Sequence, residues 1–581
     1  MKWFDTVNEL TATVRDGDRI SISGFHFIRA PIAQVVSLCS RGVTDLTYIA
    51  WGGGLPLELL LAAGAVRKIG FCFSSFDIFG LAPRFRRAIE DSQVEVEEWT
   101  ALAMIQGFKA AAQQLPFLVF QAPVASGLGA RFAVSDGAPF DDSARAPIAL
   151  APAIPLDHFL LHACRADDDG NIEIQGARGL DISTLFAAEN VLVTVEERVE
   201  RGRLGLDGRG FILPRTFVTG VCVAPFGAHP TSQLPYYCTD YRELADLASA
   251  DDPRPWQRLK GPQDERQRHL RTVASLDLET LRLLPSVEPW VKPDGDPYTT
   301  AELMACVLAR EIPDYSVCSV GSVSPLATVA YLLAKRLYAA NLVLITSNGG
   351  YIDVAPRPMS ITYSEVMDYR SAVAHLGGDD TYHWYYQKGI VTHEVVSAAQ
   401  IDQYGRTNNV QIRRAEHGLL RLPGQGGMAD VADMHRNFSL YLARQSKQNL
   451  VADVDFTSAA RSFHTEEIRR RYGYQPGVVS VLTNLGRFEY SEPQGRLVLT
   501  HLHPGVSVDQ MQENVGFPLS IEADIARTEP PRPEELSLIR GEIDPLGVRR
   551  LEFAPSKDRI GLIEELLRGE QAALDRLLKP A

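Results

Sequence analysis

The sequence predicts an α/β protein made of two related domains in one chain. The same order of signals occurs twice: a strand, a glycine turn, a proline at a helix start, an apolar helix, a second strand and a glycine-rich exit. The first copy comprises residues 20–24, Pro31, residues 45–51 and Gly52-Gly53-Gly54, and the second comprises residues 317–321, Pro325, residues 341–348 and Gly349-Gly350. Each copy describes a βαβ unit, whose strand ends form a crevice where α/β proteins bind ligands. We therefore expect two domains of one topology, with the active site at their interface.

The length and charge of the chain limit its class. At 581 residues it exceeds what one core supports and suits about two to four domains. With 58 basic and 72 acidic residues, its net charge of −14 argues against nucleic-acid binding. Seven cysteines without a CxxC pair favour neither a zinc site nor a disulfide framework. We expect no metal, no membrane contact and a cytoplasmic location, since no signal peptide or membrane-spanning apolar run occurs.

Composition divides the chain into two domains, a linker and a tail. Strand and helix signals alternate over residues 1–275, the predicted first domain. Prolines at 285, 289, 293 and 297 mark a linker over residues 276–297. Thr299 and Glu302 form a capping box that opens the second domain, residues 298–545. Residues 546–581 form a C-terminal tail whose helix suits a surface or docking role.

A second repeated pattern supports the duplication. In the first half, an apolar strand at residues 159–163 leads to an acidic turn at residues 167–171. In the second half, residues 395–399 lead to a turn that contains Asp402 and Gly405. Equivalent positions in two related domains are expected to carry such matching turns.

Motifs along both halves point to a known family. In the first half they are residues 16–20, the Gly24-Phe25 turn, and residues 45–47, 195–197 and 225–231. In the second half they are residues 399–405, 423–430, 513–517 and 543–547. Their order resembles the family I CoA-transferases, most of all the glutaconate CoA-transferase type with its A and B subunits fused. The resemblance covers nearly the whole chain and implies an A-like first domain and a B-like second domain.

The resemblance also implies an acyl-CoA substrate. In the family, a glutamate at the end of a B-half strand attacks the acyl-CoA carbonyl, and backbone amides of glycine-rich loops hold the oxyanion. The matching residues, which we expect to bind CoA or the oxyanion, are Gly24, Phe25, Asn348, Gly349, Gly424, Gln425, Gly426 and Gly427. Taken singly, each glycine fits a tight turn equally well.

The nucleophilic glutamate is missing from its expected place. After the strand at residues 342–345 the sequence reads Thr346-Ser347-Asn348-Gly349-Gly350, without a carboxylate. A threonine cannot form the acyl anhydride. Members of the superfamily that lack the glutamate resemble hydrolases, including ring-opening hydrolases that cleave a carbon–carbon bond of a cyclic β-diketo acyl-CoA. We therefore predict that water replaces the glutamate, in space left by Thr346.

Water as nucleophile requires a general base. Glu98, beside Glu97 after a predicted strand, is the candidate, and a solvated acidic strand end is the competing interpretation. His26, in the loop after Gly24, is a candidate donor to a substrate carbonyl or carboxylate, unless it faces water. Ser347 is a candidate to bind the substrate carbonyl or water, or it caps the strand end. The aromatic residues 382–386 fit an acyl pocket, a core or a dimer interface.

Three functions remain open at this point. The leading hypothesis is an acyl-CoA-processing enzyme that hydrolyses a CoA thioester or cleaves a carbon–carbon bond. The second is a true CoA-transferase whose nucleophile has moved to Asp353 or Glu98. The third is a non-catalytic CoA-thioester-binding protein, against which the intact glycine loops of both halves argue. In each case CoA enters as part of the substrate, no other cofactor is expected, and fused halves predict a homo-oligomer, most simply a homodimer.

Overall fold

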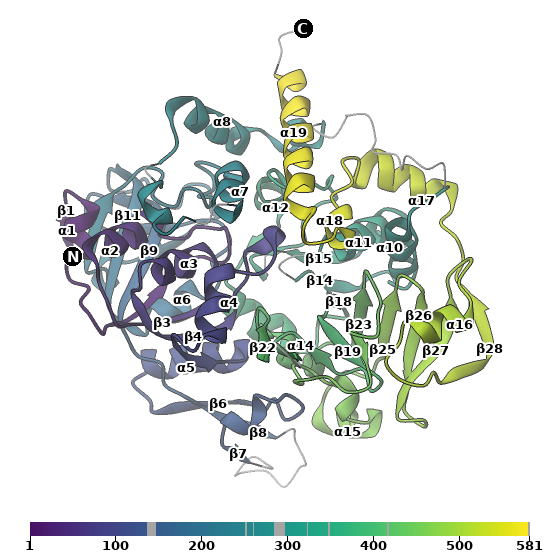
Figure 1. Cartoon of the computed structure of the whole chain (residues 1–581). Helices are drawn as coiled ribbons and strands as arrows, with labels where there is room; N and C mark the ends of the chain where they lie inside the picture. The colour runs from purple at the N-terminus through teal and green to yellow at the C-terminus, as the bar shows by residue number, and fades with distance from the viewer. Residues whose placement is uncertain are drawn as a thin grey trace.

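The computed structural model places two α/β halves side by side, with the C-terminal segment packed against both (Figure 1). It describes residues 1–135, 147–249, 252–259, 261–283, 297–321, 324–346, 349–414 and 418–578. Within these residues each half is centred on a ten-stranded sheet. This arrangement confirms the predicted α/β class.

Five parallel strands form the centre of the first sheet, in the order β3-β2-β9-β11-β13. They are β2 (Arg19–Ile22), β3 (Leu46–Gly52), β9 (Leu156–Asp167), β11 (Ala188–Val199) and β13 (Gly220–Val223). The sheet continues in parallel with β4 (Val66–Phe73) and β5 (Glu95–Glu98) on one side and β1 (Lys2–Phe4) on the other. The apolar run 191–195 of β11 is buried, as expected for a parallel strand covered on both faces.

The second sheet has the same centre. Its five parallel strands follow the order β15-β14-β18-β23-β25. They are β14 (Val317–Ser319), β15 (Val343–Thr346), β18 (His393–Ser397), β23 (Asn437–Leu442) and β25 (Val479–Thr483). In chain order, the first, second, third, fourth and fifth central strands occupy equivalent places in both sheets. The predicted duplication is thereby confirmed for the sheet centres.

The outer strands distinguish the two sheets. In the second sheet, the strands beyond β15 and β25 run antiparallel at first, whereas in the first sheet the flanking strands are parallel. The antiparallel additions are β16 (Tyr351–Ile352), β17 (Ala374–His375), β26 (Gly486–Ser491) and β27 (Arg496–Leu502), and β28 (Ile521–Arg527) then pairs in parallel with β27. The halves therefore diverge at their edges and agree at their centres.

The two acidic turns use one hydrogen-bond pattern. The Asp167 carboxylate accepts from the backbone N–H of Asn171 at 2.9 Å, and Gly170 N donates to the Asp167 carbonyl at 2.8 Å. In the second half the Asp402 carboxylate accepts from Arg406 N at 3.1 Å, and a glycine amide donates to the Asp402 carbonyl at 2.9 Å. An aspartate that ties together its own turn explains why both sequences carry the acidic residue and the glycine.

Helix starts follow the sequence signals. α2 (Ile32–Arg41) comes after β2 and α11 (Pro325–Leu337) after β14, so the two βαβ units are present. Pro325 lies in the first turn of α11, where its missing N–H removes no helical hydrogen bond. α10 (Thr300–Arg310) begins with the predicted capping box, in which Thr299 and Glu302 exchange hydrogen bonds of 3.2 and 2.7 Å.

The C-terminal tail is an integral part of the core. α19 (Arg559–Leu577) packs on α7 (Tyr241–Ser249) of the first half, and its apolar face is buried. The buried Glu570 accepts backbone N–H groups of Ile361 at 2.5 Å and Thr362 at 3.2 Å. The predicted docking role is therefore the one observed. Of the predicted linker, residues 284–296 lie outside the described residues.

Candidate active site

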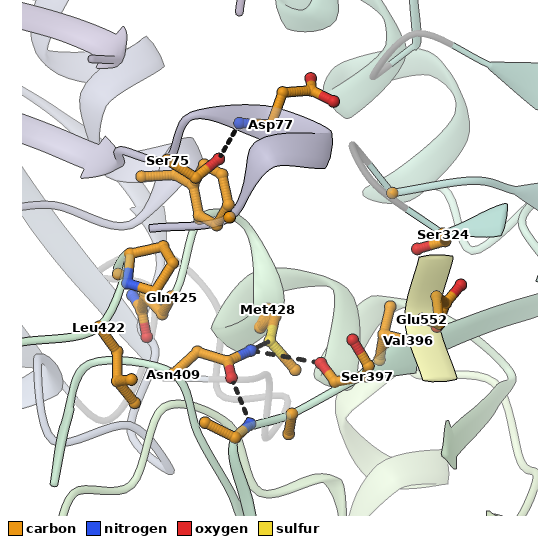
Figure 2. A pocket seen from close by; sticks show the side chains of 18 of the residues that line it. Ser75, Asp77, Ser324, Val396, Ser397, Asn409, Leu422, Gln425, Met428 and Glu552 are labelled. Carbon is orange, nitrogen blue, oxygen red and sulfur yellow. Dashed lines mark hydrogen bonds between the residues drawn. The ribbon is translucent and has the colours of Figure 1, made fainter. Parts of the chain in front are cut away.

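A cavity of about 780 Å³ lies between the two halves. Its walls include residues that directly follow β14, β18 and β23, the sheet edge at which α/β proteins bind ligands. The first half contributes Phe25, Trp51 and residues 77–81. Figure 2 shows side chains of β18, of the loop around Gln425 and of the C-terminal segment around this space. Both halves and the tail are therefore needed to form the site.

Residues 423–427, the glycine loop, join the second half to the end of β4 in the first. Pro423 O accepts from Ser74 N at 2.8 Å. The close approach requires glycine: Gly424 has φ +109°, and a Cβ there would lie 2.6 Å from the Cys72 carbonyl oxygen. These contacts bring the glycine loop to the cavity wall, as expected.

Three amides of the glycine loop are already used by the protein. Gly424 N donates to Asn409 O at 2.8 Å, Gln425 N donates to Glu98 Oε1 at 3.3 Å, and Gly426 N donates to a backbone carbonyl at 2.9 Å. The prediction that these three N–H groups hold the oxyanion is therefore wrong for this conformation. The loop lines the cavity, but its hydrogen bonds fix it to the first half.

In the Gly24-Phe25 loop of the first half, the backbone amides are likewise bonded within the protein. Gly24 N donates to Asp181 Oδ1 at 2.8 Å, and Phe25 N donates to Ile28 O at 3.1 Å. Their amides are thus occupied, which contradicts the predicted oxyanion role. The Phe25 ring contributes instead: it lines the cavity, and its centroid lies 4.6 Å from that of Trp51.

Glu98 lies behind the glycine loop and outside the cavity lining. Its Oε2 atom forms a buried ion pair with Arg421 Nη2 at 2.8 Å. Arg131 donates to the Glu98 carbonyl at 2.5 Å and also pairs with the carboxylate of Glu97. With both oxygens engaged, the Glu98 carboxylate anchors the loop, and its predicted role as general base is corrected.

His26 and Asp77 form a buried pair beside the cavity. His26 Nδ1 lies 3.6 Å from Asp77 Oδ2, and within the described residues neither ring nitrogen has a hydrogen-bond partner. Burial lowers the pKa of His26 to about 3 and raises the pKa of Asp77 to about 7. Asp77 lines the cavity and His26 does not, so the predicted substrate contact of His26 is replaced by a contact with Asp77. Figure 2 shows Asp77 held through its N–H by Ser75 Oγ at 3.2 Å.

Thr346 ends β15 but does not line the cavity. Because side chains alternate along a strand, Thr346 faces away from the side on which Ile345 packs against the first half. The Thr346 hydroxyl is buried without a hydrogen-bond partner among the described residues, and the predicted water site beside it stays a prediction. Ser347 and Asn348 lie outside the described residues, so their predicted roles stay predictions.

Two further predicted positions lie away from the cavity lining. Gly349 packs on Thr381, whose hydroxyl donates to the Gly349 carbonyl at 2.8 Å. Asp353, a proposed alternative nucleophile, pairs with Lys335 at 3.0 Å and is partly exposed. Neither group is placed to react with a ligand in the cavity.

Two residues of the aromatic segment 382–386 reach the cavity. Tyr382 and Tyr386 line the cavity and stack edge to face with centroids 4.8 Å apart, while Trp384 is half exposed. Tyr382 also meets the glycine loop, since a Cβ on Gly427 would overlap its hydroxyl. Two of these aromatic side chains therefore line the cavity, and the acyl group as their ligand stays a prediction.

Besides Asp77, two carboxylates in the cavity wall were not predicted. Glu394 lies within β18, and Glu552 lies in α18 (Arg550–Phe553) of the tail. Glu552 Oε1 accepts from Leu326 N at the start of α11 at 2.7 Å, and burial raises the pKa of Glu552 to about 7. The only sequence signal was an acidic residue beside apolar ones, which is too common to select either position.

Comparison with known proteins identifies the family. Residues 4–221 and 301–514 match the family model described as Coenzyme A transferase, so the chain belongs to the coenzyme A transferase family of enzymes. The two matched segments coincide with the two α/β halves. Within the described residues, no helix is long and apolar enough to cross a membrane.

Individual relatives match about half of the chain. The cholesterol ring-cleaving hydrolase IpdA subunit of Rhodococcus jostii is 34% identical over 289 residues, which are 46% of this chain and 95% of that protein. The A subunit of glutaconate CoA-transferase from Acidaminococcus fermentans is 29% identical over 243 residues, 39% of this chain and 76% of that protein. An acyl-CoA transferase structure from Escherichia coli O157:H7 has the same fold, with a TM-score of 0.65 at 15% identity over 91% of this chain and 95% of that one.

Proposed function

We propose that this protein uses water to hydrolyse a CoA thioester or to cleave a carbon–carbon bond of its acyl group. The observation that carries the proposal is the sequence after β15: Thr346-Ser347-Asn348-Gly349-Gly350 offers no carboxylate to form a glutamyl intermediate. The similarity to a protein named as a ring-cleaving hydrolase supports the same conclusion.

The reaction consumes one water and needs no further reagent. The oxygen of water bonds to an acyl carbonyl carbon while a base takes one of its protons. For hydrolysis, the C–S bond then breaks and the thiolate of CoA takes that proton. For carbon–carbon cleavage, the bond to the neighbouring carbon breaks and the proton goes to the leaving carbanion. The aromatic and apolar side of the cavity, with Phe25, Trp51, Tyr382 and Tyr386, fits the acyl group.

The two carboxylates considered as nucleophiles for a CoA-transferase do not line the cavity. Asp353 pairs with Lys335 away from the cavity, and Glu98 pairs with Arg421 behind the glycine loop. A transferase reaction would therefore need another carboxylate of the cavity wall. The cavity formed by both halves argues against a protein that only binds CoA thioesters, since reactive groups line it together with apolar ones.

The proposal is tested by incubating the full-length protein with a panel of acyl-CoAs and following products by mass spectrometry. Straight-chain, branched, dicarboxylic and cyclic β-diketo acyl-CoAs cover the substrate classes. We expect free CoA, or a ring-opened acyl-CoA heavier by one water, from at least one member. If every thioester is bound but none is changed, the protein is a binding protein and the proposal fails.

A further inference from the structure

Glu394 enters the cavity from the wall between the two halves. Its strand position is in register with Ser319 on β14 and with Phe438 on β23. Val396, two residues further along the same strand, lies in the apolar cluster that contains Trp51, so this face of the sheet looks toward the first half. Glu394 is therefore a carboxylate in an apolar wall, 6% exposed, at the place where both halves meet.

A buried histidine lies directly beside this carboxylate. His435 Nδ1 is 2.7 Å from Glu394 Oε2, and His435 is fully buried. The contact is close enough for an ion pair but is not aligned as a hydrogen bond, and within the described residues both atoms lack another partner. The Tyr386 ring packs edge to face on the imidazole with centroids 4.7 Å apart, which limits rotation of the imidazole.

The other carboxylates of the cavity are more fully engaged. Glu552 Oε1 accepts an aligned hydrogen bond from Leu326 N at 2.7 Å. Asp77 Oδ1 accepts from the N–H of the next residue at 2.7 Å, and its other oxygen faces His26. Glu394 receives no aligned hydrogen bond from any described residue. Its oxygens are thus the ones left for a water or substrate in the cavity.

We infer that Glu394 is the general base of the proposed reaction and that His435 is a positioning residue for it. This inference rests on the proposed function. Glu394 removes a proton from water as the water oxygen bonds to the acyl carbonyl carbon. When the C–S or C–C bond breaks, the protonated Glu394 gives that proton to the thiolate or carbanion, so the carboxylate is restored. His435 holds the carboxylate toward the cavity and takes no part in bond changes.

The test compares three variants on an acyl-CoA that the unmodified enzyme converts. Glu394→Gln keeps the shape but removes the base, and kcat should fall about 10²- to 10⁴-fold. Glu394→Ala should be as slow, and formate should restore part of its activity by occupying the vacated space. Glu489→Gln, on β26 of the same sheet and outside the cavity, is the matched control and should keep full activity.

The outcomes separate this inference from the proposed function. Titration calorimetry with CoA verifies that each variant still folds and binds. Turnover by Glu394→Gln at the unmodified rate overturns the inference but leaves the proposed function standing. A glutamyl adduct on Glu394, trapped by hydroxylamine, overturns the base role and makes Glu394 a nucleophile. Absence of turnover by the unmodified enzyme removes both proposals.

His435 has its own test. His435→Asn should lower kcat about tenfold and leave KM within twofold, because the base is misplaced while binding is unchanged. Formate should then rescue the Glu394→Ala/His435→Asn double variant as well as it rescues Glu394→Ala, since formate does not need positioning. A rise in KM without loss of kcat would show that His435 only maintains the cavity and would overturn its positioning role.

Discussion

Replacing Arg421 by Met tests whether Glu98 anchors the glycine loop. Arg421 Nη2 and Glu98 Oε2 are 2.8 Å apart, with side chains 4% and 7% exposed, and the guanidinium lies over the Phe71 ring at 5.2 Å. Methionine keeps the apolar contact with the ring but leaves the Glu98 carboxylate buried and uncompensated. Breaking a buried pair in this way costs about 3–5 kcal/mol. Glu98→Gln in the same chain removes the stranded charge, so the double variant should recover most of that loss.

The assay combines global and local measurements. Urea unfolding gives the loss of stability, and hydrogen–deuterium exchange of the peptide that spans residues 421–427 reports opening of the loop. We expect Arg421→Met to raise exchange there most, because the Glu98 carboxylate also accepts from Gln425 N. A loss below about 0.5 kcal/mol, or additive single and double variants, would refute the anchoring role and reopen a catalytic role for Glu98.

Two further predictions follow from glycine geometry and from burial. Gly424→Ala should destabilise the protein and abolish CoA binding, because the added Cβ would lie 2.6 Å from a carbonyl oxygen. Gly426→Ala is the control: the nearest atom to its Cβ would be 3.8 Å away, so the substitution should cost only about 1 kcal/mol of backbone strain. In the unmodified protein the lowered pKa of His26, about 3, and the raised pKa of Asp77, about 7, act in opposite directions. Between about pH 4 and 6.5, His26 carries a proton in the unfolded chain but not in the folded protein, so its contribution makes stability rise with pH. Over the same range Asp77 keeps its proton in the folded protein but not in the unfolded chain, so its contribution makes stability fall with pH. Asp77→Asn removes the second effect, and urea unfolding should show stability rising by about 1.4 kcal/mol per pH unit relative to the unmodified protein; a pH-independent difference would contradict the paired shifts.

The duplication could be read from the sequence because its signals are local. A glycine at a strand end, a proline at a helix start and an aspartate that closes its own turn act within a few residues. The turns at Asp167 and Asp402 have the same hydrogen-bond pattern, in agreement with the matching sequences. The antiparallel pairing of the outer strands in the second sheet was not predicted, because pairing direction depends on the partner strand.

The candidate site was less predictable because its groups meet across long stretches of chain. Whether Glu98 is a base or an anchor depends on Arg421, which lies 323 residues away. The amide of Gly24 is occupied by Asp181, again a distant residue. Glu394 lies in a short strand of mixed polar and apolar residues, and its position in the cavity wall is evident only when the two halves come together. Sequence patterns find loops and strands but do not show which hydrogen-bond donors are already used.

The nucleophile, water or a protein carboxylate, decides whether this protein is a hydrolase or a CoA-transferase. Mass spectrometry of a single turnover in H₂¹⁸O, with acetate present as an acceptor acid, identifies it most directly. With water as the nucleophile, we expect either free CoA and an acid that carries one ¹⁸O, or a ring-opened acyl-CoA that carries one ¹⁸O. We expect no acetyl-CoA and no CoA adduct on the peptide of residues 342–355. Formation of acetyl-CoA, or a glutamyl- or aspartyl-CoA adduct anywhere in the chain, would show that a protein carboxylate is the nucleophile and that the protein is a CoA-transferase.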